Sequence, residues 1–152
     1  MSFNVVINSS DKFSGSDDIN QVYALDWSFM QEGEYDMTFS FRTETKNFDY
    51  DQDVQAIDCP DLTVFNSYKA GDSVTAQTSS VIGKVKLADV RKDYNDLAKM
   101  YGYADFKDNP PIRVSKPKAN FFTVRLLDVT GAVLTENPGN YILILHFEKV
   151  AS

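Results

Sequence analysis

The stretch that decides the fold is residues 21–42, which read QVYALDWSFMQEGEYDMTFSFR. Large apolar side chains stand at every second position in both halves of it: Tyr23, Leu25, Trp27 and Phe29, and then Tyr35, Met37, Phe39 and Phe41. This period of two is typical of strands with one buried face. A tight connection at 31–34 lies between the halves, so we predict a β-hairpin whose large side chains share one face.

A hairpin cannot shield so large an aromatic face from water, and an isolated hairpin is only marginally stable. A second sheet must therefore cover this face, which predicts a sandwich rather than one open sheet. In this packing Trp27, the only tryptophan of the chain, is expected in the core rather than on a ligand-binding surface.

Most of the remaining chain also has extended character, interrupted by turn-forming residues. The strand candidates are 3–8, 54–57, 62–65, parts of 74–90, 112–115 as an edge strand, 120–127 and 132–134. The run from Tyr141 to Phe147 is apolar on both faces, which predicts a central strand covered on both sides. One helical signal lies between Asp89 and Met100, where apolar residues recur at steps of three and four.

About eight strands with regularly spaced turns predict an all-β fold. The expected architecture is an antiparallel β-sandwich, preferably an eight-stranded jelly roll, with at most one short helix near 89–100. No internal repeat or low-complexity linker divides the chain, so residues 1–152 are predicted to form a single β-sandwich domain.

Composition narrows the classes of function. Hydrophobic residues make up 43% and charged residues 24% of the chain, which is the balance of a protein with a folded core. The formal net charge of -7, with Lys and Arg scattered, disfavours direct binding to nucleic acid or to an anionic membrane surface. We see neither a signal peptide nor an apolar run of roughly 20 residues, so we expect a protein made in the cytosol without a membrane-spanning segment.

The residue types needed for catalysis are not grouped. A nucleophile and base pair would have to use His146, the only histidine, whose place in the final apolar strand favours a core or interface residue. The single Cys59 excludes an intrachain disulfide and a cysteine-based zinc site, and we expect it to be a small apolar filler. No catalytic residue, cofactor site or metal site is predicted, and the chain is not expected to be an enzyme.

The acidic loop at 47–53 is the one segment considered for a metal ion, because alternating carboxylates can surround calcium. It departs from the EF-hand pattern, since Val54 stands at the sixth position from Asp49 and Pro60 at the twelfth. A solvated loop, a contact to a basic partner and a bound cation are left open there.

A resemblance rests on the alternating segment 23–41, on Asn109-Pro110-Pro111, and on the strand and turn patterns of 122–131 and 141–148. Together these stretches resemble minor capsid proteins of nucleocytoplasmic large DNA viruses, which are giant icosahedral viruses. The resemblance covers the first and last thirds of the chain better than 49–81. It implies a jelly-roll-like sandwich that binds and stabilises capsomers of the major capsid protein, has no enzymatic activity, and assigns no functional residues.

The partners implied by this resemblance are the major capsid protein and other minor capsid proteins. The implied location is the capsid shell of the virion, assembled in the host cytoplasm, and self-association is left open. The alternative is a soluble ligand-binding β-sandwich module, lectin-like or receptor-binding, without catalytic activity, because the fold alone does not decide function.

Overall fold

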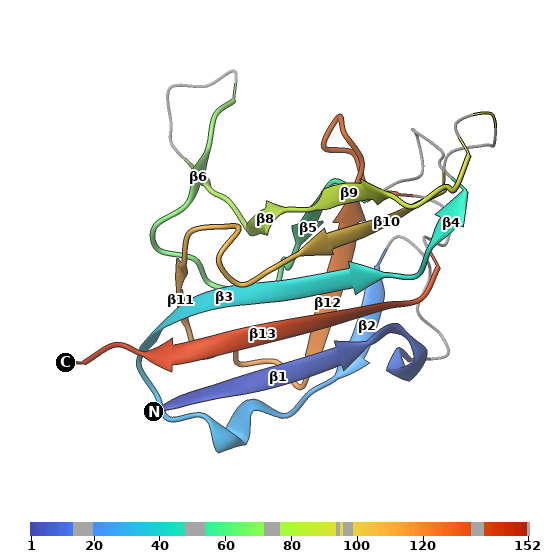
Figure 1. Cartoon of the computed structure of the whole chain (residues 1–152). Helices are drawn as coiled ribbons and strands as arrows, with labels where there is room; N and C mark the ends of the chain where they lie inside the picture. The colour runs from blue at the N-terminus through green and yellow to red at the C-terminus, as the bar shows by residue number, and fades with distance from the viewer. Residues whose placement is uncertain are drawn as a thin grey trace.

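Two antiparallel β-sheets pack against each other in the computed structural model of the chain, and their strands cross at a steep angle (Figure 1). The structure describes residues 1–13, 20–47, 54–71, 77–93, 95, 99–134 and 139–151. The elements are β1 (Ser2–Asn8), η1 (Ser9–Asp11), β2 (Gln21–Ala24), η2 (Trp27–Phe29), β3 (Glu34–Thr43), β4 (Lys46–Asn47), β5 (Ala56–Asp58), β6 (Tyr68–Lys69), β7 (Gln77–Thr78), β8 (Val81–Lys84), β9 (Lys86–Asp89), β10 (Lys99–Ala104), β11 (Ile112–Ser115), β12 (Phe121–Leu127) and β13 (Tyr141–Lys149).

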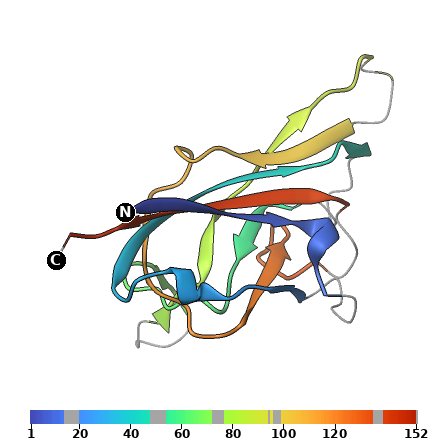
Figure 2. The ribbon, with the colours of Figure 1, turned by 90° about the horizontal axis from the view of Figure 1, so that it is seen from below.

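The first sheet has seven strands, in the order β1-β13-β3-β10-β4, with β11 also pairing with β3 and β9 with β10. The second sheet has four strands, in the order β2-β12-β5-β8, and β6 and β7 form a separate two-stranded ribbon. Seen from below, the first sheet forms one layer and the second lies beneath it (Figure 2). The predicted all-β class with antiparallel sheets is confirmed. The eight-stranded jelly roll is not, since the described strands do not divide into two sheets of four.

The predicted hairpin at 21–42 is wrong, although both of its strands exist. β2 pairs with β12 in the second sheet, whereas β3 pairs with β13, β10 and β11 in the first. The first strand ends at Ala24 because the Asp26 carboxylate accepts a hydrogen bond from the Ser28 amide (2.9 Å) and begins the 3-10 turn η2. This turn breaks the alternation, so Trp27 is buried while Phe29 is 53% exposed.

The helix expected near 89–100 is not found in the described part of that range. Its ends lie in strands, with Ala88 opposite Tyr101 and Met100 opposite Asp89. The carboxylates of Asp89 and Asp93 accept hydrogen bonds from the amides two residues later, and such local bonds favour turns over helix. Residues 94 and 96–98 lie outside the described residues.

The final strand is interior to its sheet, as predicted, since β13 lies between β1 and β3. Its expected cover on both sides is wrong. Leu143, Leu145 and Phe147 are fully buried against the second sheet, but Ile142 is 44% exposed. The edge strand predicted at 112–115 is confirmed as β11.

The core between the sheets is aromatic where η2 meets the first sheet. The ring of Phe147 stacks on that of Phe3 (centroids 5.3 Å apart) and meets the edge of Trp27 (5.8 Å). Phe122 of β12 meets Trp27 from the second sheet at 5.5 Å. Because these rings come from both layers, they tie the sheets together through edge-to-face and stacked contacts.

A buried hydrogen-bond chain joins the sheets at the other end of β13. The Tyr141 hydroxyl donates to Gln21 Oε1 (2.6 Å) and receives a hydrogen bond from the Tyr23 hydroxyl (2.7 Å). The Tyr141 amide donates to the Ser9 hydroxyl (2.9 Å), and all four residues are buried. Buried polar groups are costly unless they are paired, so this chain fixes how β2 sits on β13.

Replacing Tyr141 with Phe is expected to lower the free energy of unfolding by about 1 to 3 kcal/mol, because it removes the partner of two buried polar groups. Denaturant unfolding measures this loss. The control is Tyr103→Phe, on the face of β10 that points away from the core, which should change the free energy of unfolding little. A loss no larger than the control's would mean that the chain does not hold the sheets together. In the double variant Tyr23→Phe with Tyr141→Phe, the loss of unfolding free energy should be smaller than the sum of the losses in the two single variants.

Burial raises the pKa of both Tyr23 and Tyr141, and for Tyr141 the neighbouring Tyr23 raises it further. In the unfolded chain both phenols ionise near pH 10, so their stabilising effect is complete below about pH 10 and is lost as the pH rises above it. The free energy of unfolding should fall there by up to about 1.4 kcal/mol per pH unit for each of the two. Urea titrations at stepwise alkaline pH measure this slope, which should be shallower in Tyr141→Phe. An unchanged slope in that variant would contradict the assignment.

Candidate functional site

His146 lies on the side of the first sheet that faces away from the core. Its Nδ1 is 2.7 Å from the Asn4 side-chain oxygen on β1, and its ring meets the edge of the Phe106 ring at a centroid distance of 6.1 Å. These contacts orient the imidazole between an amide and an aromatic ring. They supply neither a nucleophile nor a third residue of the kind that a catalytic triad uses.

Cys59 is fully buried in the core cluster. Burial raises the pKa of its thiol well above the ordinary value, and the nearby Asp58 and Asp61 raise it further. A thiol that resists ionisation is a poor nucleophile, so the structure places Cys59 as a packing residue, as the sequence predicted.

The described residues hold no group of three or more His, Cys, Asp or Glu side chains that could bind a metal ion. Of the acidic loop predicted at 47–53, only Asn47 belongs to the described residues, at the end of β4; 48–53 lie outside them. Among the described residues, no helix is long and apolar enough to cross a membrane.

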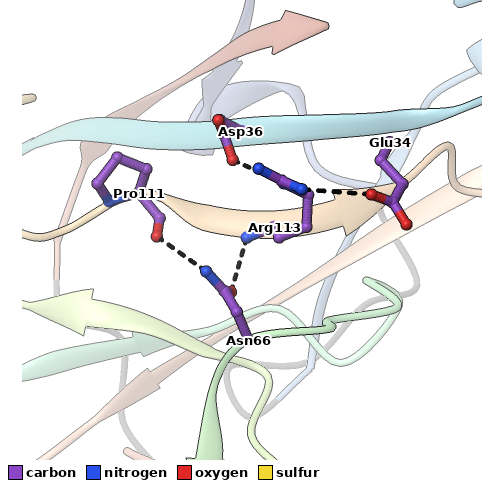
Figure 3. A network of polar contacts seen from close by, with 5 residues as sticks. All are labelled: Glu34, Asp36, Asn66, Pro111 and Arg113. Carbon is purple, nitrogen blue, oxygen red and sulfur yellow. Dashed lines mark hydrogen bonds and ion pairs between the residues drawn. The ribbon is translucent and has the colours of Figure 1, made fainter. Parts of the chain in front are cut away.

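One pair of carboxylates does come together, on Arg113 of β11 (Figure 3). The Arg113 guanidinium donates from Nε to Asp36 (2.8 Å) and from Nη1 to Glu34 (3.3 Å), both on the neighbouring β3. Both carboxylates face the same cation, and the two ion pairs raise the pKa of Arg113. The cluster therefore acts as a cross-strand ion pair rather than as an acid and base pair.

Asn66 completes this cluster on the other side of β11. Its side chain accepts a hydrogen bond from the Arg113 amide (2.7 Å) and donates to the Pro111 carbonyl (3.5 Å). The backbone of 63–65 also bonds to β11, from the Phe65 amide to the Arg113 carbonyl (2.9 Å) and from the Ser115 amide to the Thr63 carbonyl (3.2 Å). The outer edge of β11 is therefore closed by the chain itself.

The side of the first sheet that faces away from the second carries apolar and aromatic side chains. Val6 on β1 lies opposite Ile144 on β13, and Val6 is 64% exposed. Ile142 on β13 and Phe106, which contacts His146, are also exposed on this side. We call these five residues the outer strip: Val6, Phe106, Ile142, Ile144 and His146.

Beside the outer strip, Arg42 of β3 lies opposite Ile142 and points over the ring of Tyr101, 4.4 Å from its centroid. The Tyr101 ring in turn contacts that of Tyr103, with centroids 5.7 Å apart. A guanidinium over an aromatic face is a favourable cation–π contact, which holds Arg42 along the sheet.

A groove of about 460 Å³ opens where β3 ends and β13 begins. Its lining residues include Asn8, Ser10, Arg42, Glu44, Asn140 and Ile142. Amide, hydroxyl, guanidinium and carboxylate groups thus converge beside an apolar side chain, an arrangement that can bind a small polar ligand.

Sequence reasoning did not find the outer strip or the groove. The sequence predicted a strand at 3–8 and a strand covered on both sides at 141–147. Val6 and Ile142 are nevertheless exposed, because no described segment forms a layer over them. The groove residues come from three separate segments, around 8–10, 42–44 and 140–142, so no local pattern in the sequence could have grouped them.

Trp27 is 2% exposed, which confirms its prediction as a core residue. Its indole Nε1 is buried and has no hydrogen-bond partner among the described residues. The residue lies at the margin of a hollow of about 270 Å³ that is also lined by Glu32, Lys116 and Lys118. Since the ring itself packs on Phe122 and Phe147, we assign it to packing between the layers.

Trp27→Ala is expected to lower the free energy of unfolding by about 3 to 5 kcal/mol, because it leaves a cavity between the sheets. Phe29→Ala, at the exposed ring of the same turn, is the matched control and should cost much less. Denaturant unfolding measures both, and the native fluorescence of Trp27 should be blue-shifted and poorly quenched by acrylamide. Red-shifted, readily quenched emission from the isolated chain would overturn the assignment.

The chain was compared with protein-family models, curated proteins and solved structures, and none of them matched it.

Proposed function

We propose that this chain is a non-catalytic structural protein of a virion, a minor capsid component that binds capsomers of the major capsid protein in a large icosahedral virus. Two things support the proposal. The sequence resembles minor capsid proteins of nucleocytoplasmic large DNA viruses, and the described residues offer an uncovered apolar strip rather than a catalytic cluster. The outer strip is the observation that carries it.

The outer strip has the character of a contact surface. Val6 and Ile142 are 64% and 44% exposed on the adjacent strands β1 and β13, and Phe106, 37% exposed in the turn after β10, packs against His146 of β13. Exposed apolar side chains grouped in this way mark protein–protein contacts. The strip is flanked by Arg42 and Tyr101, and arginine and tyrosine are enriched in interfaces. A rigid sheet loses little conformational freedom when it binds, which suits a cement between capsomers.

The net charge of the chain limits which partner surfaces would bind it favourably. The chain carries a formal net charge of -7, so a partner surface with neutral or basic residues around an apolar centre suits it best. The same charge makes the packaged nucleic acid an unfavourable partner. The proposed location is therefore the shell, and the proposed partners are those that the resemblance implies, the major capsid protein and other minor capsid proteins.

Quantitative mass spectrometry of gradient-purified virions tests the proposal. The chain should be present in a copy number compatible with icosahedral symmetry. Ile142→Asp in the outer strip should reduce its incorporation at least about tenfold, as expected when a charge enters an interface centre. Val129→Asp is the matched control, because Val129 is similarly exposed (48%) but follows β12 in a turn. Absence from purified particles, or equal incorporation of both variants, would refute the proposal.

A second candidate function is favoured by the groove at the end of β3. It would make the chain a ligand-binding module, lectin-like or receptor-binding, in which Asn8, Arg42 and Asn140 contact a polar ligand such as a glycan. A glycan array probed with the isolated chain separates the two functions. Binding that is lost in Arg42→Ala, together with absence from virions, would replace the structural proposal with this one.

A further inference from the structure

Strand β1 forms an open edge of the first sheet. Among the described residues it pairs with β13 alone, through seven consecutive residue pairs from Ser2–Glu148 to Asn8–Ile142. Seen from below, β1 runs along the near side of this sheet, and no described segment is drawn across it (Figure 2). Within the part of the chain that the structure describes, the second side of its backbone is therefore unpaired and can accept another strand.

The register shows which backbone groups face this edge. The Lys149 amide donates to the Met1 carbonyl (2.9 Å), so these two residues form a hydrogen-bonded pair of the antiparallel ladder. Hydrogen-bonded pairs alternate along such a ladder, which directs the backbone of Phe3, Val5 and Ile7 toward β13. The amides and carbonyls of the residues between them point outward, namely Ser2, Asn4, Val6 and Asn8.

The edge lacks the features that keep other edges from pairing. β1 is seven residues long and contains no charged residue and no proline, and its ladder with β13 has no bulge. By contrast, β4 at the far end of the sheet has two residues, and the outer side of β11 is bonded to 63–65. Long, uncharged and apolar edges are the ones that accept a further strand.

We propose that β1 pairs antiparallel with β1 of a second copy of this chain, about a two-fold axis at Val5, so that the two seven-stranded sheets become one continuous sheet. In this register Asn4 faces Val6 of the other copy, Ser2 faces Asn8, and Val5 faces Val5. Every outward amide and carbonyl of both strands then finds a partner, giving about eight new hydrogen bonds. The inference does not rest on the proposed function, since it concerns the isolated chain.

A second copy suits this edge because the pairing brings no like charges together. β1 itself is uncharged. On the face of β13 that points away from the core, the nearest acidic residue is Glu148, which lies opposite Ser2. The two Ser2 residues lie six positions apart in the proposed register, about 20 Å. That separation exceeds the screening length of about 8 Å at physiological salt. The net charge of -7 on each copy is therefore not focused at the contact.

Apolar side chains beside the edge also favour this occupant. Phe3 is half-buried and contacts Phe29, whose ring is 53% exposed, at a centroid distance of 5.3 Å. In the proposed register Phe3 faces Ile7 of the second copy on the core side. In the dimer, Ile7 of each copy would therefore cover the exposed part of the Phe3 and Phe29 rings of the other copy. The two-fold symmetry repeats this contact at both ends of the strand pair.

Sedimentation velocity of the untagged full chain between about 1 and about 200 µM tests the pairing, with the wild type expected as a concentration-dependent dimer. Two double variants test the register. Asn4→Lys with Val6→Lys places like charges opposite each other twice, whereas Asn4→Lys with Val6→Glu places opposite charges there. The first should raise the dimer dissociation constant at least about tenfold relative to the second.

These variants share exposed positions on the outward side of β1, so circular dichroism should show both folded like the wild type. A general effect of net charge would act in the other direction, because the two lysines make the chain less negative. A wild type that stays monomeric over this range, or equal dissociation constants for the two variants, would overturn the proposal. If the lysine pair fails to fold, Val6→Lys alone is compared with Val6→Thr, because the two introduced amines would lie diagonally across the strand pair, about 7 to 8 Å apart, and should still weaken the dimer.

Discussion

The nine-residue antiparallel ladder between β3 and β13 is the element on which the rest of the structure depends. β1 pairs with one side of it, and β10 and β11 pair with the other. Its inner face carries Phe39, Phe41, Leu143 and Leu145, all buried, and such a face must be covered to be stable in water. The second sheet supplies that cover, so the ladder sets both the strand order of one layer and the need for the other.

The two layers meet through contacts of different kinds at the two ends of β13. At one end aromatic rings from both layers surround Phe147, and at the other Tyr141 is hydrogen bonded to Tyr23 and Gln21 of β2. Apolar packing tolerates some sliding of one sheet over the other, whereas a buried hydrogen bond loses its value over a fraction of an ångström. The polar chain therefore specifies the alignment that the apolar core stabilises.

What the fold leaves uncovered is as informative as what it buries. The chain closes the outer edge of β11 with 63–65 and places an ion-paired arginine there, but no described segment protects the edge of β1 or the outer strip in this way. Exposed apolar side chains and an unpaired strand edge both favour association with other chains. The two features lie next to each other on β1 and β13.

The sequence by itself determined the all-β class and the strands at 35–42, 112–115, 120–127 and 141–147, because side-chain alternation is a local property. Trp27 is buried as predicted, but in the turn η2 rather than in the predicted strand. The sequence could not decide which strands pair. The alternation in the two halves of 21–42 predicted a hairpin. In the structure an Asx turn at Asp26 ends the first strand, and the two strands belong to different sheets. Exposure of Ile142, the groove beside Arg42 and the open edge of β1 were decided only by the tertiary structure. The physical reason is that each depends on whether another segment, distant in sequence, packs or pairs there.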